Sequence, residues 1–125
     1  MSVREEKYNN RPSEYSTWHR TLDKKCKTMD ADWIEYRYDG RGIVAFIETA
    51  RKPDDVKLCD LMDRKLEFEV AVLFEIQTKM RVPCYVVWHT EDLTTFYVCT
   101  ILSSMQLYIW KTWSKKEYAE FIEKL

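Results

Sequence analysis

The spacing of hydrophobic residues predicts one helix near the N-terminus and two strands after it. Residues 13–22 place aromatic and aliphatic side chains at helical spacing after Ser13, a residue type that caps helix N-termini. The runs at 30–38 and 43–49 are rich in aromatic and β-branched residues, which is typical of strands. Because the run IVAFI in the second of them is apolar on both faces, we expect a central strand there.

The longest helical pattern runs from about Lys57 to Met80 and ends before Pro83. Its apolar stripe, with one glutamine on it, consists of Leu58, Leu61, Met62, Leu66, Val70, Leu73, Phe74, Gln77 and Met80. A stripe of this kind predicts a helix that packs one face against a sheet.

The last third of the chain predicts three more strands and a final helix. CYVVWH at 84–89 is typical of a buried strand, and 96–102 and 107–113 of two further strands. Ser114 is a candidate N-cap for the last helix. The order α-β-β-α-β-β-β-α, with a helix between two buried strands, predicts an α/β fold with a crossover within the sheet.

The only two glycines of the chain lie in DGRG at 39–42, which predicts a sharp turn between the first two strands. The geometry of this turn decides which side chains face each other. A two-residue turn sets Asp32 opposite Ile47 and leaves Glu48 on the other face. One extra residue in the turn, or a bulge at a glycine, sets Asp32 opposite Glu48 instead.

Two carboxylates opposed on adjacent strands repel each other, and such a pair normally needs a cation. Hard cations such as Mg²⁺ or Mn²⁺ prefer oxygen ligands, and a bound ion can activate water and offset charge on a phosphate. The spacing alone leaves a second interpretation open, in which Asp30, Asp32 and Glu48 are solvated strand-end residues.

Composition narrows the class of protein. At 125 residues and 46% hydrophobic content, the chain suits one domain over 1–125, with 1–11 loosely ordered. A net charge of −1 argues against a general polyanion binder. The polar N-terminus and the lack of a long apolar run predict a cytoplasmic protein. Without a CxxC pair, buried reduced thiols are expected at Cys26, Cys59, Cys84 and Cys99.

The stretch MDADWIEYR…IVAFIE resembles the core of the PD-(D/E)XK nuclease superfamily, which includes restriction endonucleases and Holliday-junction resolvases. There, an aspartate precedes a hairpin whose apolar second strand ends in Glu-x-Lys, and a long helix and a buried strand follow. The resemblance covers roughly residues 13–90 and implies a restriction-endonuclease-like αβββαβ core with a mixed sheet flanked by helices, extended here by C-terminal strands and a helix.

The resemblance also implies roles for individual residues. Asp32 and Glu48 are the expected metal ligands for Mg²⁺ or Mn²⁺, with Asp30 as the alternative to Asp32. The backbone carbonyl of Thr49 and the carboxylate of Glu14, on the first helix, are expected to support them. Gln77 is a candidate supporting residue, with a buried structural glutamine as its other interpretation.

Ala50 departs from the pattern, because it stands where the superfamily has the lysine that positions water and offsets phosphate charge. Three explanations stay open. The alanine is an engineered inactivating change; or the charge has moved to Lys52 or Lys65; or the protein is a natural non-catalytic relative.

A phosphate-binding rim would lie around the hairpin, and its binding would weaken steeply with salt. The candidates are His19, Arg20, Lys24, Lys25, Arg51, Lys52 and Lys57. The leading hypothesis is therefore a metal-dependent DNA endonuclease, weakened or inactive as the Ala50 form and possible as a homodimer. The alternative is a non-catalytic interaction module or a subunit of a larger complex.

Overall fold

The computed structural model describes residues 13–25, 32–64, 67–103 and 106–125. Its elements in chain order are α1 (Ser13–His19), β1 (Trp33–Arg37), β2 (Gly42–Arg51), α2 (Leu58–Arg64), α3 (Glu67–Met80), β3 (Cys84–His89), β4 (Thr95–Ser103), β5 (Gln106–Ser114) and α4 (Lys115–Glu123).

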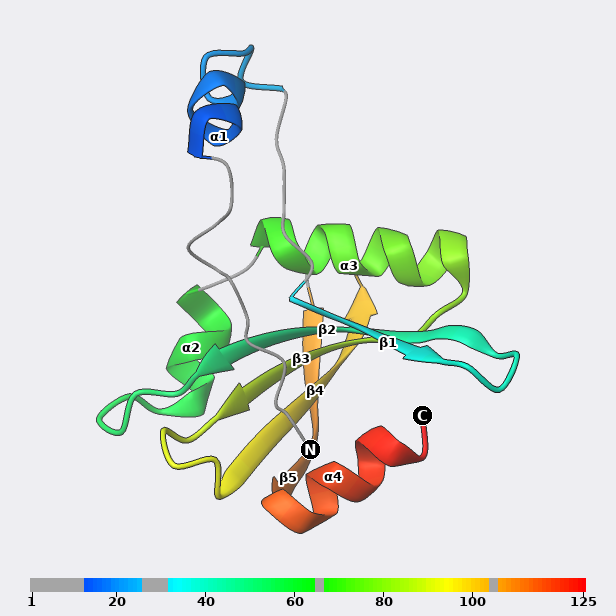
Figure 1. Ribbon diagram of the computed structural model, residues 1–125. Coiled ribbons are helices and arrows are strands. Elements are labelled where there is room, and N and C mark those ends of the chain that lie inside the picture. Colours follow the sequence, from blue (N-terminus) through cyan, green and yellow to red (C-terminus); the bar gives the residue numbers. More distant parts are fainter. Residues whose placement is uncertain (1–12, 26–31, 65–66, 104–105) are drawn as a thin grey trace.

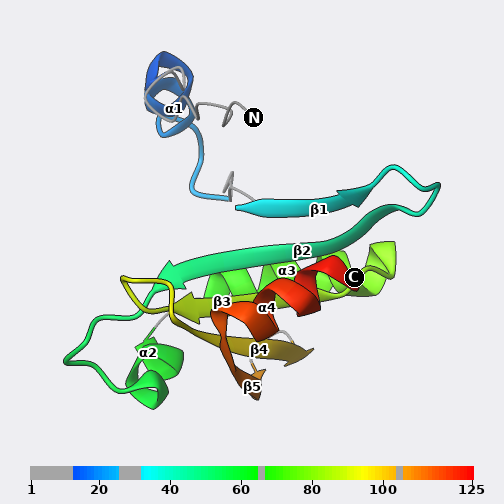
Figure 2. The same ribbon diagram turned by 60° about the horizontal axis from the view of Figure 1, so that its bottom comes forward.

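The strands form one five-stranded sheet in the order β1-β2-β3-β4-β5. Only β2 and β3 are parallel, and the other neighbouring pairs are antiparallel. Helix α3 covers one face of the sheet and α4 the other, while α1 stands apart from it (Figures 1 and 2). The expected α/β class, with a mixed sheet flanked by helices, is thus confirmed.

One detail of the order expected from the pattern is wrong. The pattern predicted as one helix from Lys57 to Met80 forms two helices, α2 and α3, and Met80 is about half exposed at the end of α3. Within the described residues, two strands separate α1 from these helices, as the pattern predicts, whereas the αβββαβ core that the resemblance implies has three.

The core has one cluster on each face of the sheet. On the α3 face, Val70 and Leu73 of the helix pack with Phe46, Val86 and Trp88. On the other face the apolar stripe of α4 packs over a second cluster of sheet residues, which comprises Ala45, Ile47, Val87, Phe96 and Val98. Since Ala45, Phe46 and Ile47 are all buried, β2 is covered on both sides as its apolar run predicts.

Helix α4 is fixed at both ends. Ser114 and Glu117 form a capping box at its start, as the N-cap prediction requires. At its end, the carbonyl oxygens of Ile122 and Leu125 accept hydrogen bonds from Arg37 and Arg41 of the β1–β2 hairpin. Cationic groups at a helix C-terminus also interact favourably with its dipole. The hairpin and α4 are therefore held together over the second face of the sheet.

The described thiols only partly match the expectation of buried cysteines. Cys84 and Cys99 are buried, and burial raises the pKa of their thiols to about 11 and about 12. Cys59, in contrast, is exposed on α2, and Cys26 lies outside the described residues. None of the described helices has the length and apolar character needed to cross a membrane.

Gln77 joins α3 to two strands. Its Nε2 donates to the carbonyl oxygen of Ile101 at 3.2 Å, and its Oε1 accepts from the backbone N–H of Cys84 at 3.1 Å. Both side-chain groups are therefore used within the fold, as the structural interpretation of this glutamine expects.

We predict that Gln77→Leu lowers the free energy of unfolding by about 1–3 kcal/mol, because the N–H of Cys84 loses its acceptor. Urea denaturation measures this change. Gln106→Leu, the same substitution at an exposed position of β5, is the control and should shift stability by less than about 0.5 kcal/mol. Equal effects of the two substitutions would contradict a structural role for Gln77.

Candidate functional site

A bulge in β2 sets the register that brings the two expected acids together. Near the turn, Arg37 pairs with Gly42 and Tyr36 with Ile43, as a two-residue turn requires. Further on, Glu35 pairs with Ala45 and Trp33 with Ile47, so Val44 is the extra residue. One step further, this register sets Asp32 opposite Glu48. The extra residue was expected at a glycine, but it follows Ile43; Gly40 and Gly42 instead adopt positive φ in the turn.

The acid pair lies on the α3 face of the sheet. Phe46 and Ala50, which share a face of β2 with Glu48, both pack in the α3-side cluster. Glu48 comes directly after the three buried residues 45–47 and is itself half-buried. It therefore stands at the edge of the core rather than in open solvent.

Asp32 is held in place by Thr49. Its Oδ2 accepts a hydrogen bond from the backbone N–H of Thr49 at 3.0 Å and a longer one from the Thr49 hydroxyl at 3.4 Å. The Thr49 oxygen in turn accepts a hydrogen bond from Trp33 Nε1 at 3.0 Å. The Asp32 side chain thus accepts a hydrogen bond from a backbone N–H of β2 that lies beyond the residues of β2 paired with β1.

The environment of Glu48 favours its protonated form. Burial, followed by the charge of Asp32 and a hydrogen bond with its side chain, raises the pKa of Glu48 to about 7, and the charge of Glu69 on α3 adds to this. Glu48 Oε2 is buried and has no hydrogen-bond partner. A buried acceptor without a donor is costly, so this oxygen marks a place where a proton or a cation would be stabilised.

Glu69 was not among the sequence-predicted residues. Glu69 lies on α3 one helical turn before Leu73, a residue of the buried stripe, and Glu69 itself is half-buried. An acid four residues before a core position of the crossover helix is the signal that could have indicated it.

The donor set fits a hard divalent cation. Phe46 and Lys52 donate their N–H groups toward the β3 side, so the N–H and C=O of Thr49 point to the β1 side, near Asp32. Asp32 Oδ1, Glu48 and this carbonyl offer oxygen ligands, and Mg²⁺ is commonly held by one or two carboxylates with water and substrate completing the shell. The described residues contain no group of three or more His, Cys, Asp or Glu side chains arranged around a metal position.

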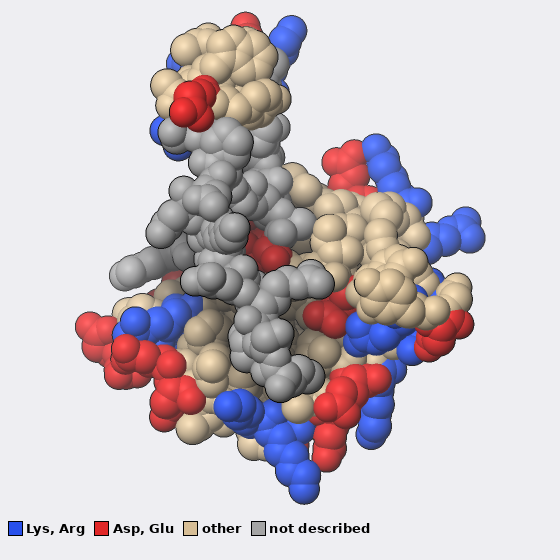
Figure 3. Space-filling view, viewed as in Figure 1, with Lys and Arg blue, Asp and Glu red and all other residues tan. Residues whose placement is uncertain are grey.

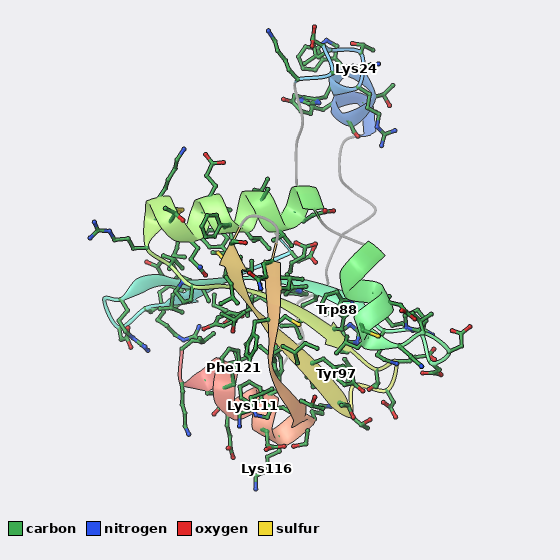
Figure 4. All side chains as sticks on the ribbon, turned by 180° about the vertical axis from the view of Figure 1, so that it is seen from behind. Lys24, Trp88, Tyr97, Lys111, Lys116 and Phe121 are labelled. Carbon is green, nitrogen blue, oxygen red and sulfur yellow. The ribbon has the colours of Figure 1, made fainter. Side chains whose placement is uncertain are left out.

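Ala50 has the orientation that a site residue would need but not the chemistry. It shares the α3 face with Glu48 and pairs in register with Trp88 of β3. Trp88 is fully buried near α2 (Figure 4), and its Nε1 has no hydrogen-bond partner. Arg51 lies on the opposite face of β2 and pairs with Glu91 at 3.0 Å.

The remaining expected residues are spread over the molecule. Glu14, His19, Arg20, Lys24 and Lys25 lie on α1 or just after it, and Lys24 is seen far from the sheet in Figure 4. In the described contacts none of the five reaches the acid pair. Asp30 and Lys65 lie outside the described residues. The structure therefore gives the position of Asp32 but offers no comparison with Asp30.

The basic candidates beyond α1 are Arg51, Lys52 and Lys57, at the end of β2 and in the loop after it. Lys52 Nζ donates to the carbonyl oxygen of Pro53 at 3.3 Å, and Lys57 is exposed after the following loop. In the space-filling view, acidic and basic side chains are interspersed over this face (Figure 3). A phosphate-binding rim around the hairpin therefore stays a prediction.

Comparison of the chain with protein-family models, with curated proteins and with solved structures finds no match. The resemblance to the PD-(D/E)XK superfamily thus rests on the motif residues and on the pairing of Asp32 with Glu48.

We predict that stability falls as pH rises from about 4.5 to about 7 because of Glu48. In this range the folded protein holds a proton that the unfolded chain has lost. Glu48→Gln should remove the dependence and raise the free energy of unfolding at pH 8 by about 1–2 kcal/mol, after allowance for solvent screening. Urea denaturation between pH 5 and pH 8 measures the effect. Asp55→Asn in the exposed loop is the control, and a Glu48→Gln protein with the wild-type pH dependence would contradict the assignment.

Proposed function

We propose that this protein is a nuclease-fold protein that binds Mg²⁺ or Mn²⁺ through Asp32 and Glu48 and acts on the phosphodiester backbone of DNA. The supporting observation is the buried, unpartnered Oε2 of Glu48 beside a second carboxylate. A structural surface hairpin has no need to hold two carboxylates in this way, whereas a cation-binding pair does.

Each residue of the pair contributes differently. Thr49 fixes Oδ2 of Asp32 through two hydrogen bonds, and a cation would take the place of the proton in the hydrogen bond between Asp32 and Glu48. With a pKa of about 7, Glu48 exchanges its proton for a cation at neutral pH. A bound divalent ion supplies charge stabilisation at a phosphate and an activated water.

Ala50 limits what this site can do. A short apolar side chain beside Glu48 neither orients water nor offsets negative charge on a phosphate, and the nearby Lys52 amine is hydrogen-bonded to Pro53. We therefore propose that the Ala50 form binds metal and cleaves weakly or not at all.

A second candidate function is a non-catalytic interaction module. The observation that favours it is the exposure of large apolar side chains, with Tyr36 53% and Tyr38 97% exposed on the hairpin, and Tyr15 64% and Trp18 54% exposed on α1. Exposed aromatic groups of this kind are typical of partner-binding surfaces. In this alternative the acid pair binds no metal.

We predict that calorimetry detects Mn²⁺ binding, and that binding at pH 6.5 releases protons because the cation displaces the proton of Glu48. Proton release is measured by repeating the titration in buffers of different ionisation enthalpy. Asp32→Asn and Glu48→Gln should abolish binding, while Asp54→Asn in the exposed loop should leave it unchanged. Absence of Mn²⁺ binding would favour the interaction module.

We further predict that Ala50→Lys gives cleavage of supercoiled or branched DNA in the presence of Mn²⁺, because the amine would stand on the same face as Glu48. The control is Ala50→Met, which has similar length and no charge. A variant that binds Mn²⁺ normally but does not cleave would overturn the account of Ala50 as the missing catalytic cation.

A further inference from the structure

A concave site lies on the face of the sheet opposite to the acid pair. It is a cavity of about 330 Å³ between strands β1–β4 and helix α4. This volume is at the lower end of the ~300–1,000 Å³ typical of pockets that hold small ligands. The cavity lies beside Thr49 and His89, near the carboxyl ends of the parallel strands β2 and β3, where ligands commonly bind in α/β sheets.

The cavity has an apolar floor, aromatic walls and an open mouth. Ile47, Val87 and Phe96 form the floor and are each at most 8% exposed. Phe96 is stacked on Tyr118 of α4, with ring centroids 4.2 Å apart and an interplanar angle of 2°. At the mouth, Trp33 and Leu93 are 42% and 40% exposed. A flat ligand could therefore enter and contact aromatic surface.

One carboxylate stands in this mostly apolar lining. Glu35 is 24% exposed, and its Oε1 accepts a hydrogen bond from Arg37 at 3.0 Å, so the carboxylate keeps further acceptor sites. The pKa of the Tyr118 hydroxyl is raised to about 12, mainly by burial and further by the charge of Glu35. Although Arg37 balances its charge, the Glu35 carboxylate thus gives the cavity hydrogen-bond acceptor sites next to aromatic rings.

The composition of the lining selects a class of ligand. No lysine or arginine lines the cavity, which disfavours phosphate and other anions. A purely aliphatic ligand would leave the remaining acceptor sites of Glu35 unused. A planar heterocycle with two adjacent N–H donors can stack on the aromatic rings and donate hydrogen bonds to the carboxylate. Among the nucleobases, guanine has such an edge.

We propose that this cavity binds a single guanine-type nucleobase, with its ring against Trp33 and its N–H edge hydrogen-bonded to Glu35. Enzymes that bind extruded bases combine the same two contacts, namely stacking on aromatic side chains and hydrogen bonds to the base edge. The proposal goes beyond the nuclease function, because neither Asp32 nor Glu48 lines the cavity and guanine binding requires no metal.

The test is a titration with guanosine, in the absence of metal and DNA, followed by the Trp33 indole N–H signal in ¹H–¹⁵N spectra. The signal is assigned with a Trp33→Phe variant. We expect guanosine to shift it, and adenosine, which lacks the paired donors, to bind about tenfold more weakly. Because no Mn²⁺ is present, the outcome does not depend on whether the acid pair holds a cation.

Two variants decide the role of Glu35. Glu35→Gln should weaken guanosine binding about tenfold, because one acceptor becomes a donor. Glu75→Gln on the solvent face of α3 is the matched control and should bind guanosine as the wild type does. The proposal is overturned if guanosine leaves the Trp33 signal unchanged, if Glu35→Gln binds it with unchanged affinity, or if adenosine binds equally well. Preserved dispersion of the other indole signals shows that each variant is folded.

Discussion

The arrangement of the acid pair and of the cavity depends on one unpaired residue, Val44 in β2. The register near the turn would set Asp32 opposite Ile47, on the α4 face, and Trp33 opposite Phe46, on the α3 face. The bulge at Val44 reverses this, since a one-residue shift moves every side chain of a strand to the other face. Asp32 then joins Glu48 on one side, and Trp33 and Glu35 line the cavity on the other.

The acid pair lies where the core ends. Residues 45–47 of β2 are buried on both faces, and burial decreases from Glu48 onward. A carboxylate in full solvent would keep an ordinary pKa, and one in the middle of the core would stay neutral. At this boundary Glu48 changes protonation near neutral pH, which is the condition under which a cation can compete with a proton. The same boundary is the physical reason to expect that ionised Glu48 costs stability.

The elements of the fold were predictable because their signals are local. The glycine turn, the apolar run of β2 and the capping box at Ser114 each depend on a few neighbouring residues. The break between α2 and α3 was missed because the apolar stripe continues through both helices. The bulge was foreseen only as an alternative, and at a glycine, because register depends on packing across the sheet. Glu69 and the cavity depend on contacts between distant elements, which a pattern along one chain does not contain.

Thr49 connects the two faces of the sheet. Because Trp33 Nε1 can only donate, the Thr49 hydroxyl oxygen accepts the hydrogen bond from Trp33. The single hydroxyl proton of Thr49 is then donated to Asp32. The direction of the hydrogen bonds from cavity to acid pair is therefore fixed. A ligand that moves the Trp33 ring would alter the donor that Thr49 presents to Asp32, and with it the orientation of one of the two proposed metal ligands. By thermodynamic reciprocity, a cation at the acid pair would change the affinity of the cavity by the same factor.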